Sequence, residues 1–201
     1  MRKAIIHLKK SDPLLAAVID RVGPCRIEYR EAEFSTLVRS IVYQQLSGKV
    51  AAVIFERFLH LLPRQKLTPG AILRLSIADL RSAGLSNAKA AYILDLAEKT
   101  QARSIKFHEL PALSDNEVIA SLTQVKGVGV WTAHMFLIFA LQRPDVLPVG
   151  DLGVRSAIKK LYGLEALPLP AEVERIAGAW RPYCSIATWY LWRSLDGAAE
   201  I

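Results

Sequence analysis

Signals that start and stop helices recur along most of this chain, and they constrain its fold more than any other feature, because strand-like alternation is nearly absent. Ser114 and Glu117, for example, have the spacing of a capping box. Asp12 supplies a cap and Pro13 a first-turn proline for a helix that runs to about Val22. At 201 residues the chain is long enough to bury a substantial core. We therefore predict an all-α fold.

The most informative stretch is LTQVKGVGVWTAHMF, residues 122–136, which predicts a helix, a glycine-rich turn and a second helix. Gly127 and Gly129 can adopt positive φ and let the backbone approach a ligand closely. The second helix presents unpaired N–H groups at the positive end of its dipole, so the turn can hold a phosphate. On glycine spacing alone, an ordinary tight turn between two helices is an equal alternative.

Charge and cysteine content narrow the function classes. Lys and Arg number 26 against 19 acidic residues, and the net charge of +7 favours an anionic partner without identifying it. Cys25 and Cys184 have no neighbouring Cys or His at ligand spacing, so they predict neither a zinc site nor a four-cysteine cluster. No apolar run approaches the roughly 18 residues that cross a bilayer, and the N-terminus does not resemble a secretory signal. We expect an intracellular protein without membrane contact.

Asp151 is the candidate catalytic carboxylate. It occupies the N-cap position of a helix predicted over residues 152–161, which Gly163 closes. The positive end of a helix dipole favours a negatively charged side chain there. From position alone, however, Asp151 is more simply explained as a helix cap than as a catalytic group.

Several segments, taken together and in order, resemble one family. VKGVGVWTA is similar to the hairpin motif of the helix-hairpin-helix (HhH-GPD) DNA glycosylase superfamily, and LPVGDLGV, some twenty residues on, resembles the loop that carries its catalytic aspartate. IVYQQLSGKVA, GLSNAKAAYILDLAE and RPYCSIATWYLWR resemble three further family segments. The resemblance extends from about Phe34 to Leu195 and is closest to the 3-methyladenine DNA glycosylase II branch.

The resemblance implies two packed helical lobes, a helix-hairpin-helix motif and a DNA-binding cleft between the lobes. We expect residues 1–201 to form a single glycosylase unit. One lobe, 32–143, would contain the hairpin, and the other, 1–31 plus 144–201, the terminal helices. The implied partner is double-stranded DNA containing damaged bases, and the implied assembly is a monomer. Its expected location is the cytoplasm, with the nucleoid, in a bacterium or the nucleus in a eukaryote.

The resemblance also implies the reaction. Cleaving an N-glycosidic bond builds positive charge on the sugar, which a carboxylate stabilises, and this favours Asp151 as the catalytic residue. Bifunctional relatives attack the sugar with a lysine just after the hairpin, where this chain has Trp131. Because indole cannot form a Schiff base, we predict hydrolysis without strand cleavage. The expected substrates are alkylated bases: 3-methyladenine, then 7-methylguanine and ethenoadenine.

The remaining roles fall into three groups. The hairpin would hold the DNA backbone and share a monovalent cation with a phosphate, through Val125, Lys126, Gly127, Val128 and Gly129. The residues expected to fill the gap left by the flipped base are Gln45 and Leu46, with Gln44 as a third candidate. The expected base pocket comprises Trp131, Tyr43, Trp189 and Ser47. We expect no cofactor and no catalytic metal.

Alternatives remain open for individual residues and for function. Leu46 fits a core position equally well, with the two glutamines beside it forming a solvated corner. Lys126 replaces a proline that is common in the family, and Cys184 stands where many relatives have arginine. The other functions to consider are a glycosylase for uracil or for mismatched or uncharged lesions, and a DNA-binding module without catalysis.

Overall fold

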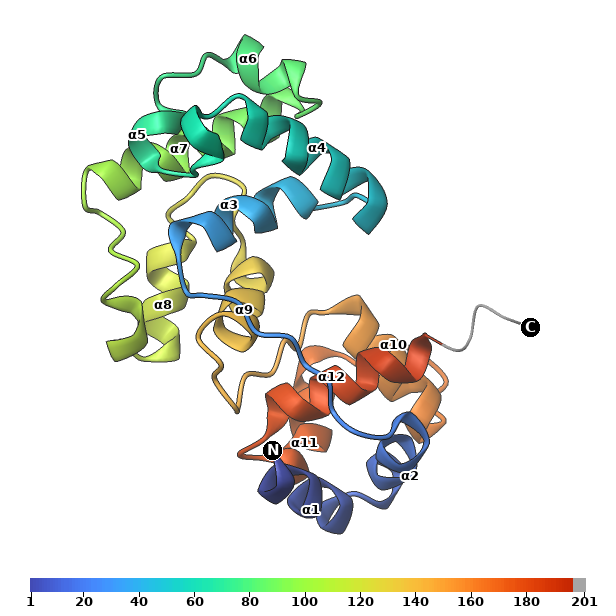
Figure 1. Ribbon diagram of the computed structural model, residues 1–201. Coiled ribbons are helices and arrows are strands. Elements are labelled where there is room, and N and C mark those ends of the chain that lie inside the picture. The colour runs from blue at the N-terminus through green and yellow to red at the C-terminus, as the bar shows by residue number, and fades with distance from the viewer. Residues whose placement is uncertain (197–201) are drawn as a thin grey trace. The chain divides into compact units, whose positions relative to one another are not determined.

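A computed structural model describes residues 1–196, in which helices are joined by turns and loops and no β-strand occurs (Figure 1). The predicted all-α fold is confirmed. Two compact units divide the chain: unit 1 combines Met1–Tyr29 with Gln142–Ile201, and unit 2 is Arg30–Leu141. These boundaries, at Arg30 and Gln142, each lie two residues before the expected ones, at residues 32 and 144. Within the described part, no helix is long and apolar enough to span a membrane.

Unit 1 is built from segments at both ends of the chain. Figure 1 shows its blue N-terminal helices beside its orange and red C-terminal ones. Helix α12 lies at the centre of this unit, because all its residues from Cys184 to Leu191 are buried. The elements of unit 1 are α1 (Arg2–Ser11), α2 (Pro13–Val22), α10 (Leu152–Tyr162), α11 (Pro170–Ala177), the 3-10 turn η3 (Gly178–Trp180) and α12 (Cys184–Leu195).

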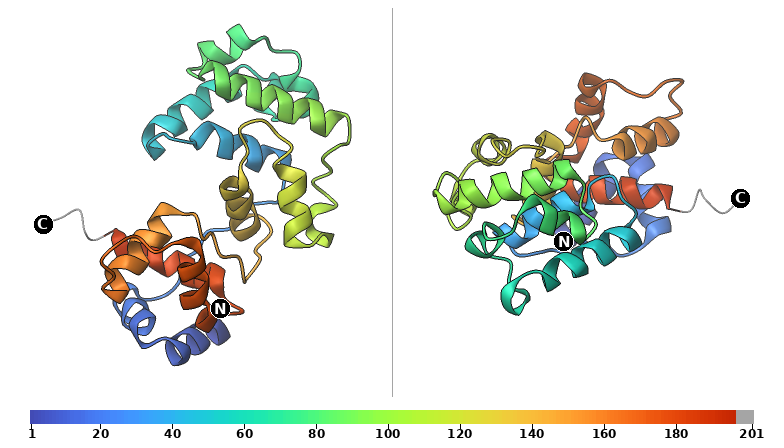
Figure 2. Two further views of the ribbon diagram at one scale, coloured as in Figure 1. Left: turned by 180° about the vertical axis from the view of Figure 1, so that it is seen from behind. Right: turned by 90° about the horizontal axis from the view of Figure 1, so that it is seen from above.

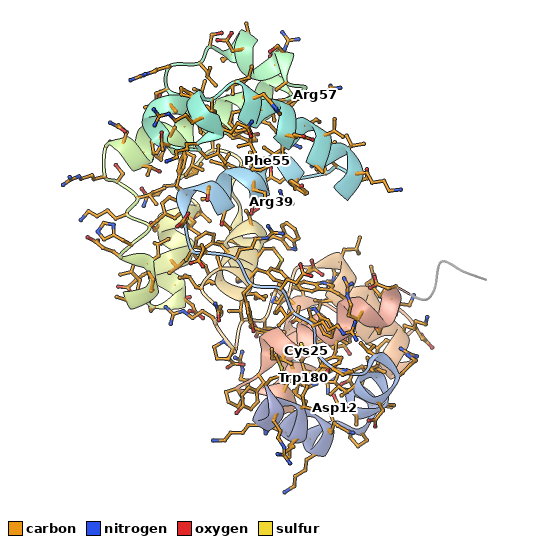
Figure 3. The ribbon with its side chains drawn as sticks, viewed as in Figure 1. Asp12, Cys25, Arg39, Phe55, Arg57 and Trp180 are labelled. Carbon is orange, nitrogen blue, oxygen red and sulfur yellow. The ribbon has the colours of Figure 1, made fainter. Side chains whose placement is uncertain are left out.

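A buried carboxylate, Asp12, ties three elements of unit 1 together. Its Oδ1 caps α2 by accepting 3.0 Å hydrogen bonds from the backbone N–H groups of Leu14 and Leu15. Its Oδ2 accepts a 2.7 Å hydrogen bond from the indole of Trp180 and another from the Tyr162 hydroxyl. Figure 3 labels Asp12 and Trp180 in this unit. Burial, and then the carboxylate itself, raise the pKa of Tyr162, which keeps its hydroxyl a donor.

Unit 2 packs α7 against α3, α5 and α6, and α8 against α9. The two views of Figure 2 show α7 lying beside these helices. Apolar residues at helical spacing on α3 form the buried face that meets α7: Leu37, Val38, Ile41 and Val42. The elements of unit 2 are α3 (Phe34–Tyr43), α4 (Gly48–His60), η1 (Pro63–Gln65), α5 (Pro69–Ile72), α6 (Ile77–Ser82), α7 (Asn87–Gln101), η2 (Leu110–Ala112), α8 (Asp115–Leu122) and α9 (Val130–Phe139).

Local capping signals located the helices well. Helix α2 has its predicted bounds, and Ser114 forms the predicted capping box with Glu117. Two details differ from the sequence-based expectations. Helix α1, which buries Ala4 and Leu8, precedes the first predicted helix. The first-turn preference of proline would start the last helix at Pro182, but α12 begins at Cys184, whose N–H donates to the Asp145 carboxylate at 3.2 Å.

Candidate functional site

Asp151 is the N-cap residue of α10 in unit 1 and is only 8% exposed. Its Oδ1 accepts a 2.7 Å hydrogen bond from the backbone N–H of Val154. The indole Nε1–H of Trp192, on α12, donates a second hydrogen bond of 2.9 Å to the same oxygen. The carboxylate is thus oriented both by its own helix and by a side chain 41 residues further along the chain. Its capping role is compatible with a chemical role.

Gly153 leaves room for this arrangement. A Cβ atom at this position would lie 3.0 Å from Cδ1 of Trp192 and 3.1 Å from Oδ1 of Asp151, closer than ordinary van der Waals contact. A larger residue would therefore displace the indole or the carboxylate. Sequence reasoning assigned no role to Gly153 or Trp192. The aromatic content of the last helix was the only signal for Trp192, and it does not indicate which ring reaches Asp151.

The predicted hairpin joins α8 to α9 in unit 2 as a turn over residues 123–129. Gly127 has a φ of +75°, and a Cβ atom there would lie 2.0 Å from the ring of Tyr92 on α7. The turn therefore packs its backbone directly on an aromatic ring, which only glycine permits. Val125 and Val128 bury their side chains, so they can present only backbone atoms to a ligand. Lys126 and Gly129 are exposed.

Asp95 on α7 anchors the first half of the hairpin. Its Oδ2 accepts a 2.9 Å hydrogen bond from the backbone N–H of Lys126, and its Oδ1 accepts one of 2.6 Å from the ammonium of Lys99. Burial opposes the charged form of Asp95. The hydrogen bonds from Lys99 and Lys126 outweigh burial, and the pKa of Asp95 lies below its ordinary value. A negative charge is thus held directly beneath the hairpin.

Gln44 links the corner between α3 and α4 to the hairpin. Its Nε2 donates to the carbonyl of Gly127 at 3.0 Å and to Oγ1 of Thr132 at 3.4 Å. The ammonium of Lys89 donates to the carbonyls of Val42 and Gln44, at 2.7 and 2.6 Å, and so satisfies acceptors at the end of α3. Partial burial lowers the pKa of Lys89. These contacts favour a positioning role for Gln44 over insertion into DNA.

A cavity of about 690 Å³ opens within unit 2 beside the hairpin. Five predicted site residues line it: Tyr43, Gln44, Gln45, Gly127 and Trp131. Trp131 is 49% exposed, a large fraction for an indole side chain. The cavity therefore combines aromatic walls with amide groups and the backbone of the hairpin.

The Tyr43 ring of this cavity is held from behind. The guanidinium carbon of Arg39 lies 4.0 Å from the centroid of the Tyr43 ring and 5.1 Å from that of Phe55, and Figure 3 labels Arg39 on α3 and Phe55 on α4. The two rings also meet edge to face, with centroids 6.3 Å apart. Arg39 and Phe55 were not predicted to contribute to the site.

The other predicted residues lie elsewhere. Ser47 caps α4 by accepting the N–H of Val50 at 3.5 Å. Leu46 is exposed and lines a smaller neighbouring cavity of about 210 Å³. Trp189 belongs to unit 1, where it is buried and contacts Tyr190 edge to face. Among residues 1–196, no group of three or more His, Cys, Asp or Glu side chains is placed to hold a metal ion.

The fold and these sites define a class. The described helices include two, α8 and α9, that are joined by a glycine-rich hairpin. Another helix, α10, is capped by an oriented carboxylate. These features define a helix-hairpin-helix protein with an acidic residue at its candidate site. The sequence matches the HhH-GPD superfamily of base excision DNA repair proteins over residues 38–182, and the chain belongs to that superfamily.

Named relatives agree with this assignment. DNA-3-methyladenine glycosylase 1 of Schizosaccharomyces pombe is 34% identical over 199 residues, which cover 96% of this chain and 87% of that protein. The solved 3-methyladenine DNA glycosylase of S. pombe in complex with abasic DNA has a TM-score of 0.86 at 34% identity, covering 99% of each chain. DNA-3-methyladenine glycosidase from Bacillus halodurans has a TM-score of 0.84 at 36% identity, covering 96% of this chain and 89% of that one. The predicted superfamily and branch are confirmed.

The contact between Gly127 and Tyr92 yields a stability prediction. Gly127→Ala combines a strained positive φ with a Cβ atom driven into the ring, and we expect it to lower the free energy of unfolding by about 3 kcal/mol or more. Thermal and urea unfolding, followed by circular dichroism, would measure the loss.

Gly129→Ala is the matched control, because it changes the other hairpin glycine, where nothing lies within 4 Å of the added carbon. Because Gly129 is the N-cap residue of α9, where alanine is less favourable than glycine, we expect this substitution to lower the free energy of unfolding by about 1 kcal/mol or less. Equal stability of the two variants would contradict the proposed packing of the hairpin on Tyr92.

Proposed function

We propose that this chain is a monofunctional DNA glycosylase, which flips alkylated bases out of double-stranded DNA and hydrolyses their N-glycosidic bonds. Its substrates are 3-methyladenine and, beyond it, 7-methylguanine and ethenoadenine. The observation that carries the proposal is the carboxylate of Asp151, which two N–H donors hold in one orientation in a chain of the base excision repair superfamily. The identity of 34% to a glycosylase named for 3-methyladenine supports the substrate class.

Asp151 stabilises the sugar while the bond to the base breaks. The electron pair of the C1′–N bond moves onto the base, and positive charge builds on C1′ and the ring oxygen of the sugar. The carboxylate stabilises this charge electrostatically. A water molecule then adds its oxygen to C1′ and releases a proton to solvent, leaving an abasic sugar and a free base.

Alkylation assists the departure of the base. The bases 3-methyladenine and 7-methylguanine carry a positive charge in DNA, so each leaves as a neutral molecule without first being protonated, whereas the uncharged ethenoadenine must take up a proton from solvent before it leaves. A cationic base also stacks favourably on electron-rich rings. In unit 2 the rings of Tyr43 and Trp131 line one cavity, and they are the proposed base-recognition surface. Trp189 and Ser47 remain weaker candidates, because one is buried and the other caps a helix.

The hairpin grips the DNA backbone in this proposal. The N–H groups at the start of α9 have no side-chain cap and meet a phosphate at the positive end of the helix dipole. Backbone carbonyl oxygens are suitable ligands for a monovalent cation, and those of hairpin residues 125–129 would hold it beside the phosphate. A bound cation would supply positive charge to the same phosphate.

Gln45 and Leu46 fill the space left by the flipped nucleotide. Gln45 adopts a φ of +55° at the corner before α4, and Leu46 is 37% exposed. An apolar side chain offered at a tight, exposed corner suits insertion between bases. As a DNA repair enzyme, the protein acts where the genome is: with the nucleoid in a bacterial cytoplasm or in a eukaryotic nucleus.

Asp151→Asn tests the catalytic role. Asparagine is also a good N-cap, so the variant keeps α10 capped while losing the negative charge. We expect release of 3-methyladenine from methylated DNA to fall by roughly 100-fold or more. Chromatography of the released bases would measure the rate, and melting curves would verify the fold.

The same assay separates the alternatives. Undiminished release by folded Asp151→Asn would overturn the catalytic assignment. A wild-type protein that releases uracil or mismatched thymine in preference to methylated purines would belong to the second glycosylase class. DNA binding with no base release would indicate a non-catalytic module.

Trp192→Phe tests whether the indole positions Asp151. Phenylalanine keeps an aromatic ring but removes the donor to Oδ1, and a hydrogen bond to a charged group contributes about 1.5 kcal/mol or more. We expect kcat to fall roughly tenfold with little change in KM. Tyr190→Phe is the control on the same helix, because it removes a hydrogen bond to the carbonyl of Gly23 instead. Equal kcat values in the two variants would count against positioning by Trp192.

Borohydride trapping tests the monofunctional assignment. Trp131 cannot form a Schiff base with the sugar, so we expect no covalent protein–DNA adduct and an abasic strand that stays intact until alkali is added. Gel electrophoresis of end-labelled damaged DNA would show both results, with a known glycosylase–lyase as the positive control. A trapped adduct would show that another amine of the chain acts as a nucleophile.

A further inference from the structure

One face of α7 supports the hairpin through consecutive turns. Tyr92 lies beneath Gly127, and Asp95, three residues on, accepts the backbone N–H of Lys126. Lys99 follows one turn later and pairs with Asp95 as an i,i+4 neighbour. The two residues that touch the hairpin and the lysine that pairs with one of them thus share a helical face.

Asp95 places a negative charge next to a hairpin that is proposed to bind the negatively charged DNA backbone. A carboxylate is a strong acceptor for a backbone N–H, which explains how it fixes the start of the hairpin. The same negative charge, 6% exposed and poorly screened, would repel a phosphate that binds to the hairpin. A hairpin that binds DNA therefore needs this charge neutralised from within the protein.

Two lysines are close enough to neutralise it, and they differ in accessibility. The Lys126 ammonium is 3.8 Å from Oδ1 of Asp95, and its side chain is 73% exposed, so it can turn toward a phosphate at little cost. The Lys99 ammonium is 2.6 Å from the same oxygen, and its side chain is 28% exposed. Of these two lysines, Lys99 is therefore the one that stays paired with Asp95 when DNA binds.

We propose that Asp95 positions the hairpin backbone for phosphate binding, and that Lys99 is its internal counter-ion, which raises DNA affinity without contacting DNA. This inference rests on the proposed function, because it assumes that the hairpin binds the DNA backbone. It assigns roles to two residues that lie outside the hairpin and belong to no predicted site.

Three variants separate the two roles. Lys99→Met removes the close counter-ion of Asp95 and leaves it the exposed Lys126 ammonium, 3.8 Å away, and we expect the Kd for an undamaged duplex to rise on the order of three- to tenfold, more at low salt. Asp95→Asn combined with Lys99→Met removes both charges and keeps an oxygen to accept the Lys126 N–H, so the Kd returns to within about twofold of wild type. Asp95→Ala combined with Lys99→Met also removes both charges but loses the acceptor, so binding stays weak.

Fluorescence anisotropy of a labelled duplex at two salt concentrations would measure each Kd. Lys106→Met is the matched control, because it removes a lysine from another ion pair of unit 2, with Glu109 at 3.0 Å. It loses the same net charge and should shift the Kd by less than about twofold. The rate of hydrogen exchange at the Lys126 amide gives a second readout. We expect slow exchange in wild type and in the Asp95→Asn double variant, which keep an acceptor for this N–H, and fast exchange in the Asp95→Ala double variant, which does not.

Each contrary outcome has a distinct meaning. An unchanged Kd in Lys99→Met would overturn the counter-ion role. Weak binding that Asp95→Asn fails to rescue would show that Lys99 contacts phosphate directly. Equal binding and equal amide exchange with Asn and Ala at position 95 would overturn the positioning role. A wild-type protein that does not bind duplex DNA would instead refute the proposed function.

Discussion

The contact between the backbone of Gly127 and the ring of Tyr92 is the constraint on which unit 2 depends. With a hypothetical Cβ only 2.0 Å from the ring, the turn has one way to lie on α7. That fixed position brings the N–H of Lys126 to Asp95 and the carbonyl of Gly127 to Gln44.

Side chains of unit 2 form hydrogen bonds with the backbone N–H and C=O groups of the turn. Asp95 accepts an N–H group and Gln44 donates to a carbonyl, so both kinds of backbone group find partners inside unit 2. Gln44 belongs to the corner that also carries Gln45 and Leu46. If the corner inserts into DNA and the hairpin binds phosphate as proposed, the hydrogen bond from Gln44 would hold these two parts of unit 2 in a fixed relative position while a base is flipped.

The geometry around Asp151 suits the chemical role proposed for it. A helix cap already fixes one carboxylate oxygen at the positive end of α10, and the indole of Trp192 fixes it a second time. A charge that is oriented before the substrate arrives needs no reorganisation when positive charge develops on a sugar. The small size of Gly153 leaves space for both groups, so the sequence GDLG carries more structural information than its aspartate alone.

The sequence by itself determined the helical fold, the starts of α2, α8 and α10, the glycine turn and the N-cap position of Asp151. These features depend on neighbours three or four residues away, as with Ser114 and Glu117, and such interactions can be recognised in a linear pattern. Gln44 shows the limit of this approach: its place at the corner was predictable, but the direction of its amide was not.

Only the tertiary structure decided which distant side chains hold the site. Trp192 reaches Asp151 across 41 residues, Asp95 reaches Lys126 across 31, and Gln44 reaches Gly127 across 83. No local signal encodes these pairs, because each depends on how two helices pack and which rotamer the packing allows. Local hydrogen bonding and periodicity therefore fixed the elements, and long-range packing chose the partners that orient them.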